Sequence, residues 1–201
     1  MTRNPWTPFS TFKLPVPLPE SPESTNAPIQ EMIPDYRAVA NANGMSAKPL
    51  VTTEGGWGVD GVSDADMQAA WIAQFEILEA GVAASNNLMF QSWYTWGHSS
   101  SGTIETLQGE PTEAGLAYDV VWGWLVGTTP SPCTNAGNIW SCAMEKNLVV
   151  WDASQTCSNG VCTTSAYTPP NGYVQYVDLT GTVTAINGTI QLGVKPILME
   201  P

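Results

Sequence analysis

Positive charge is scarce in this chain. Only six of its 201 residues are lysine or arginine, against 18 aspartates and glutamates, for a net charge of −12. Such a surface repels nucleic acids and anionic membranes, so neither is an expected partner. No apolar run reaches eighteen residues, so no membrane-spanning segment is expected either. Neutral partners such as sugars remain open.

Metal ligands are also few. The chain has one histidine, His98, and no Cys-x-x-Cys pair, so zinc is the weaker interpretation of its four cysteines. The spacings within Cys133/Cys142 and Cys157/Cys162 suit local disulfides that close hairpin-like loops. We therefore predict two disulfides, no metal and no cofactor. Disulfides are typical of secreted or extracytoplasmic proteins.

The first twenty residues lack the apolar run of a signal peptide. An oxidised protein without a signal peptide suggests that an N-terminal part was lost. Proline is frequent in residues 1–28, which predicts an extended segment rather than a helix or central strand.

Residues 29–128 alternate between helical and strand patterns. Helical spacing starts at Ile29 and stops near Gly44, and a short strand follows over residues 50–53. The next helix is expected from an N-cap at Ser63 to Gly81, then a strand over residues 88–96, then a helix from a cap at Thr112 to Gly127. This order predicts parallel strands covered by helices. Two strands alone are marginal in water, so this half looks cut from a larger sheet.

The sequence pattern changes in residues 130–201, where no helical spacing is found. Runs rich in Val, Tyr and Thr predict strands over residues 146–152, 173–178, 183–186 and 189–194. Asn159-Gly160 and Asn187-Gly188 are hairpin signals, and turn chemistry explains the second better than its fit to a glycosylation sequon. This half is predicted to be an all-β antiparallel sandwich.

The stretch Lys48-Pro49-Leu50-Val51-Thr52-Thr53-Glu54-Gly55-Gly56-Trp57 places an acid where a strand gives way to a glycine turn. In a βα architecture, strand ends of this kind carry catalytic groups. The alternative is that Glu54 merely caps the following loop.

Three segments, taken in order, resemble the last two βα units of clan A retaining glycoside hydrolases. They are residues 48–57, Phe90-Gln91-Ser92-Trp93-Tyr94-Thr95-Trp96 and Thr112-Glu113-Ala114-Gly115-Leu116-Ala117-Tyr118. Val149-Val150-Trp151-Asp152 and Gly193-Val194-Lys195-Pro196-Ile197-Leu198 are similar to the β-domain that follows the barrel in family 39. The resemblance covers residues 29–201. It implies a partial (β/α)8 TIM barrel over residues 29–128 and a β-sandwich domain over residues 130–201.

The resemblance also implies roles for single residues. Glu54 maps onto the nucleophile of a retaining mechanism, which attacks the anomeric carbon while a second carboxyl about 5 Å away protonates the leaving oxygen. Trp96 is the first choice for a stacking platform under the sugar and Trp93 the second. The other expected carbohydrate-binding residues are Trp57, Tyr94 and His98.

One feature of the family is missing. Its acid/base is a glutamate that follows an asparagine, and this sequence contains no Asn-Glu pair. A full barrel needs roughly 250 residues, and only 47 precede Lys48. We therefore expect the C-terminal portion of a secreted glycoside hydrolase, inactive alone. The alternatives are a non-catalytic carbohydrate-binding module, and a chain that completes its barrel with a separate N-terminal half.

Overall fold

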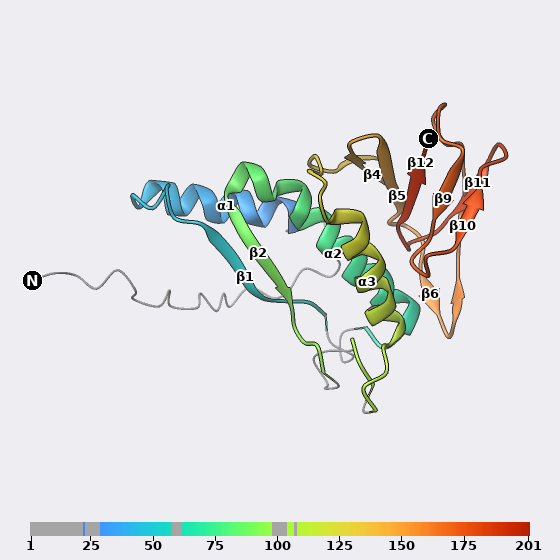
Figure 1. Ribbon diagram of the computed structural model, residues 1–201, viewed down its shortest axis with the longest axis horizontal. Helices are drawn as coiled ribbons and strands as arrows, with labels where there is room; N and C mark the ends of the chain where they lie inside the picture. Colours follow the sequence, from blue (N-terminus) through green and yellow to red (C-terminus); the bar gives the residue numbers. More distant parts are fainter. Residues whose placement is uncertain (1–21, 23–28, 58–61, 98–103, 107) are drawn as a thin grey trace, which may run out of the picture.

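The computed structural model describes residue 22 and residues 29–57, 62–97, 104–106 and 108–201. Helices and strands alternate up to residue 125, and only strands follow (Figure 1). The predicted extended segment 1–28 lies outside the described residues except for Pro22. No helix in the described part of the chain combines the length and apolar character needed to cross a membrane.

The first half has the predicted order of elements. Its bounds are α1 Ile29–Ala42, β1 Leu50–Gly55, α2 Ala65–Asn86, β2 Leu88–Trp93 and α3 Glu113–Leu125. β1 and β2 pair in parallel, as predicted, and form a two-stranded sheet. The predicted N-cap of α3 is confirmed, because the Thr112 side chain accepts a hydrogen bond from the Gly115 N–H.

The ends of α2 differ from the prediction. Its N-cap is Asp64 rather than Ser63, and the carboxylate accepts the Met67 N–H at 3.1 Å. The helix also runs through Gly81 to Asn86, and its C-cap Asn87 takes the left-handed conformation with φ 49°. Gly81 serves close packing instead of termination, because a Cβ there would lie 2.9 Å from the Ser131 carbonyl oxygen.

Arg37 ties α1 to the neighbouring elements. It is 8% exposed, and its guanidinium donates to the Asn86 carbonyl at the end of α2 and to the Lys48 carbonyl before β1, both at 2.8 Å. A buried guanidinium satisfied by carbonyl oxygens fixes the start of β1 against both helices.

The second half is built on one six-stranded antiparallel sheet. Its strands run in the order β10-β9-β12-β5-β4-β3, with two further strand pairs, β8–β11 and β6–β7, outside it. The bounds are β3 Thr134–Ala136, β4 Ile139–Met144, β5 Asn147–Asp152, β6 Cys157–Ser158, β7 Val161–Cys162, β8 Ser165–Tyr167, β9 Gln175–Val177, β10 Val183–Ala185, β11 Ile190–Leu192 and β12 Ile197–Glu200. The sequence predicted no strand at β3, β4, β8 or β12, and it predicted β6 and β7 only through the hairpin signal at Asn159-Gly160.

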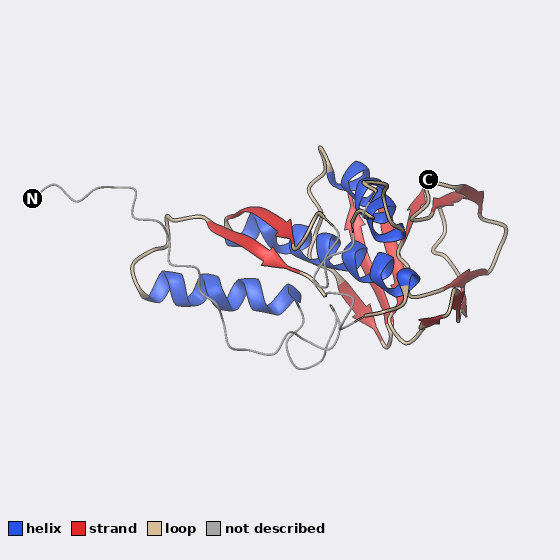
Figure 2. Cartoon of the chain, turned by 90° about the horizontal axis from the view of Figure 1, so that it is seen from below, coloured by secondary structure: helices blue, strands red, loops and turns tan. Residues whose placement is uncertain are grey.

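The two faces of this sheet pack differently. Val149 and Trp151 of β5 join a hydrophobic cluster with residues of α2 and α3, whereas Val150 joins a cluster with Ile190 and Leu192 of β11. This follows from the alternation of side chains along a strand. Helices therefore cover one face and the short β8–β11 pair covers the other, so the predicted sandwich has only a two-stranded second layer (Figure 2).

One predicted hairpin is confirmed and the other is wrong. Asn159 and Gly160 both have positive φ and connect β6 to β7, which pair with each other. Asn187-Gly188 instead connects β10, which pairs with β9, to β11, which pairs with β8. The turn thus carries the chain from one sheet to another.

Both predicted disulfides are formed. Cys133 is bonded to Cys142, and Cys157 to Cys162. The first lies in the cluster shared with α2 and α3, and the second closes the β6–β7 hairpin.

Candidate active site

Glu54 lies one residue before the end of β1, which runs through Gly55. The strand does end at the glycine pair, as expected, but two residues later than the predicted end at Thr53. Because β1 and β2 are parallel, their C-terminal ends share one edge of the sheet. That edge brings Glu54 near the chain that leaves β2, and the Tyr94 N–H donates to the Gly55 carbonyl at 2.7 Å.

An irregularity in β1 turns Glu54 away from α2. The Thr52 hydroxyl donates to Glu79 of α2, and a Cβ on Gly55 would lie 2.4 Å from the Phe75 ring, so both positions face the helix. Strict alternation would put residues 52 and 55 on opposite faces. The register shift between them resolves this, and Glu54 is exposed on the other face. Bulges commonly re-aim side chains next to active sites.

Two of the predicted carbohydrate-binding residues lie in an aromatic cluster between the strands and α2. Trp57 is 7% exposed, with ring centroids 5.3 Å from Trp71, 6.2 Å from Phe75 and 6.2 Å from Trp93. Trp93 also meets Phe75 edge-on at 5.4 Å. In this structure both indoles pack against other protein rings. Gly56, at φ 143°, leaves room for the cluster, since a Cβ there would lie 3.0 Å from Trp93.

Tyr94 and Trp96 are exposed beyond the end of β2. The predicted strand continued to Trp96, but β2 ends at Trp93, so Trp96 lies beyond the strand. Tyr94 is 48% and Trp96 56% exposed. The Trp96 indole N–H donates to Glu105 Oε1 at 2.5 Å, and its ring meets Tyr118 edge-on at 6.1 Å. His98 lies outside the described residues.

Two buried acids of α2 were not predicted from the sequence. Glu76 and Glu79 of α2 are 4% and 2% exposed, and burial raises their pKa to about 7 and about 8. Glu76 accepts a hydrogen bond from Gln91, and Glu79 accepts one from Thr52. The sequence pattern that could have indicated them is two acids three residues apart within an otherwise apolar helix. Both lie on the α2 side of the sheet, so neither can form a carboxylate pair with Glu54.

One group of described residues has metal-ligating atoms close together, namely Asp66, Cys157 and Cys162. The two sulfurs are bonded to each other, so they offer no thiolate. Asp66 forms an ion pair with Lys195, whose hydrogen bond lowers the pKa of the carboxyl. This cluster is therefore structural.

No protein-family model and no curated protein sequence matches the chain. Among solved structures, a family 39 glycoside hydrolase from the gut symbiont Bacteroides cellulosilyticus WH2 has a similar fold. The TM-score is 0.66 at 18% sequence identity, over 86% of this chain and 38% of that enzyme. The chain is thus similar in fold to a portion of a glycoside hydrolase, spanning 38% of its length.

Proposed function

We propose that this chain is the C-terminal part of a retaining glycoside hydrolase, with Glu54 as the nucleophile. The observation that carries the proposal is the exposed carboxylate at the C-terminal end of β1, turned away from α2 by the bulge before Gly55. Catalytic groups of (β/α)8 enzymes occupy this position. The fold similarity to a glycoside hydrolase supports the same assignment.

In the proposed reaction the Glu54 carboxylate attacks the anomeric carbon and displaces the aglycone oxygen, which takes a proton from a second carboxyl. Water then attacks the anomeric carbon of the glycosyl ester and displaces the Glu54 carboxylate, while the second carboxyl, deprotonated in the first step, accepts the proton of that water. We place this acid/base in a preceding segment of a complete barrel. The sequence has no Asn-Glu pair, and Glu76 and Glu79 lie on the opposite side of the strands.

The two disulfides favour an oxidising compartment, so we propose that the protein acts outside the cytoplasm. A separate carbohydrate-binding module over residues 130–201 is the less favoured function. Val149, Trp151 and Leu198 of the main sheet pack in one cluster with α2 and α3, so residues 130–201 alone would expose them.

The test compares the chain alone with the chain supplied with upstream barrel units, from its own reading frame or a co-expressed product. Aryl xylosides, glucosides, galactosides and arabinosides serve as substrates. We expect turnover only in the complemented sample, with the anomeric configuration retained. Loss of the general acid alone removes about 10²- to 10⁴-fold in rate.

A 2-deoxy-2-fluoroglycoside with a dinitrophenyl leaving group should trap the ester on the peptide that contains Glu54. Glu54→Gln should abolish both turnover and labelling. Glu110→Gln, at an exposed acid outside the site, should change neither. A label on another residue, or activity that survives in Glu54→Gln, would overturn the assignment.

A further inference from the structure

We propose that a groove between α3 and the segment before it, which includes the predicted stacking residue Trp96, binds a neutral carbohydrate. The groove encloses about 450 Å³, within the range of about 300–1,000 Å³ typical of small-ligand sites. The side chains that would meet the ligand are Trp96, Glu105, Leu116, Tyr118, Asp119 and Trp122.

One wall is a single face of α3. Gly115, Tyr118, Asp119 and Trp122 recur at intervals of three and four residues, so their positions are neighbours on the helix surface. Trp122 is 57% exposed. An indole exposed to this extent offers a flat apolar surface on which the C–H face of a sugar ring can stack.

The opposite wall of the groove is formed by Trp96 and Glu105, which are hydrogen-bonded to each other. The Glu105 N–H donates to the Trp96 carbonyl at 3.1 Å, and the Trp96 indole N–H donates back to Glu105 Oε1 at 2.5 Å. Trp96 is thus held at its polar edge and braced by Tyr118, while over half of its surface stays exposed. Binding to such a preordered ring costs little side-chain entropy.

Gly115 brings the two walls together. A Cβ on Gly115 would lie 2.2 Å from the Ile104 carbonyl oxygen, and the Thr112 N–H donates to that same oxygen at 2.9 Å. Any other residue at position 115 would push the segment that carries Glu105 off the helix. The close backbone contact between Gly115 and Ile104 therefore sets the distance between the two walls of the groove.

The polar groups of the groove select the ligand. Glu105 and Asp119 are carboxylates, and no lysine or arginine is among the described residues that line the groove. The net charge of −12 disfavours anionic ligands. An apolar helix of a partner would bury both carboxylates without donors, which is costly. Sugar hydroxyls instead donate to carboxylates while the ring face covers the indoles.

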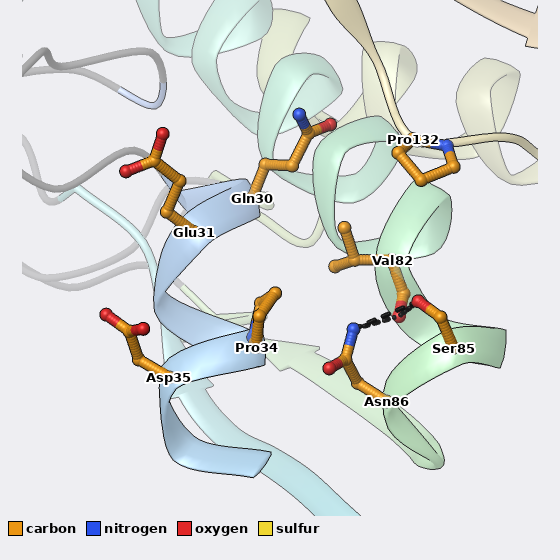
Figure 3. Close-up of a pocket in the computed structure, with 8 residues that line it drawn as sticks. All are labelled: Gln30, Glu31, Pro34, Asp35, Val82, Ser85, Asn86 and Pro132. Carbon is orange, nitrogen blue, oxygen red and sulfur yellow. Dashed lines mark hydrogen bonds between the residues drawn. The ribbon is translucent and has the colours of Figure 1, made fainter. Parts of the chain in front are cut away.

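A second cavity of similar size lacks these features. It lies between α1 and α2 and encloses about 470 Å³, and none of the described residues that line it is aromatic (Figure 3). Its Asn86 amide already donates to Val82 O and Ser85 Oγ. A comparable volume thus occurs without stacking surfaces, and we assign the sugar site to the α3 groove alone.

The test measures binding of the full chain to neutral polysaccharides by affinity electrophoresis in gels containing xylan, β-glucan, galactan or arabinan. Matching oligosaccharides are then titrated by NMR, following the tryptophan indole N–H signals. We expect retardation on at least one polysaccharide. Trp122→Ala should weaken binding about tenfold or more, and Asp119→Asn by a smaller factor.

Val126→Ala is the matched control, since Val126 is also 57% exposed and lies at the end of α3 outside the groove. It should bind as the parent does. Circular dichroism shows whether each variant is folded. The proposal is overturned if no polysaccharide in the panel binds, if folded Trp122→Ala binds normally, or if a lysine-rich peptide binds in place of sugar.

Discussion

The Thr52 hydroxyl on β1 donates a hydrogen bond to Glu79 Oε1 on α2 over 3.2 Å, so a strand of the candidate site is held by a buried acid. Burial raises the pKa of Glu79 from 4.5 to about 8 and that of Glu76 from 4.5 to about 7. Below these pKa values the folded protein therefore holds each carboxyl mainly in its protonated form.

The first prediction concerns pH. Between pH 4.5 and about 8 the folded chain binds more protons than the unfolded chain at these two positions. Their contribution to stability is complete below pH 4.5 and is lost as pH rises through 7 and 8. We expect the free energy of unfolding in urea to fall by at least about 2 kcal/mol from about pH 5 to about pH 8.

Glu79→Gln supplies the control for that trend. The amide keeps the shape of the protonated carboxyl and cannot ionise. The variant should be close to the parent at about pH 5 and more stable at about pH 8, with a flatter dependence on pH. A parallel shift of the whole profile would contradict the role of Glu79.

The second prediction concerns Gly55. Alanine there would place Cβ 2.4 Å from Phe75 Cζ, and that ring is 2% exposed and held edge-on against Trp93. The ring has no room to swing aside, so Gly55→Ala should cost about 1–3 kcal/mol of stability, the usual penalty of overpacking. Urea unfolding measures this, and Phe75→Leu in the same chain should recover part of the loss.

Gly123→Ala is a matched substitution with the opposite expectation. Gly123 lies in α3, and a Cβ added there would meet no atom within 4 Å, so alanine should stabilise the helix by up to about 1 kcal/mol. If Gly55→Ala and Gly123→Ala changed the free energy of unfolding equally, the contact between position 55 and Phe75 would not be the cause of the loss.

The sequence predicted the order of elements in the first half because caps and helical spacing are local signals, as at Thr112. It failed where tertiary packing decides. Gly81 reads as a helix stop, yet the Ser131 backbone packs on it and the helix continues. Asn187-Gly188 reads as a hairpin, but its flanking strands find partners in different sheets.

In the candidate site, too, local signals were predicted from the sequence and features set by tertiary packing were not. The position of Glu54 at a strand end followed from the β-branched run and the glycine pair. The bulge that turns Glu54 to the other face lies between Thr52 and Gly55, which face Glu79 and Phe75 of α2. No spacing within β1 reveals these contacts. Glu76 and Glu79 were overlooked because acids in a helical pattern usually face solvent, whereas α2 is covered on several sides.

The third prediction concerns the disulfides. Cys142 is fully buried and Cys133 is 4% exposed, whereas Cys162 of the other pair is half-buried at a hairpin. Because thiolate attack needs access to a sulfur, a mild reductant should open Cys157–Cys162 first. Alkylation followed by peptide mass analysis would show the order. Serine at both positions 133 and 142 should cost about 2–4 kcal/mol, and more than serine at 157 and 162.

The last prediction concerns Lys195, which lies between two acids from different helices. It pairs with Asp66 in the first turn of α2, and the proximity of Asp66 contributes, after burial, to raising the pKa of Glu113 at the start of α3. Lys195→Met would leave the two carboxyls facing each other without a cation. We expect a loss of stability that is larger at about pH 8 than at about pH 4, since both acids are ionised at the higher pH.

Asp66→Asn added to Lys195→Met should restore most of that loss, because it removes the repulsion with Glu113. The pair is partly exposed, so its coupling in a double-mutant cycle should be modest, about 1 kcal/mol or less. The helices and the β half meet here, and Gln74 of α2 donates to the Val194 carbonyl nearby in sequence. A pH-independent loss in Lys195→Met would instead assign its role to packing of the side-chain stem against α2.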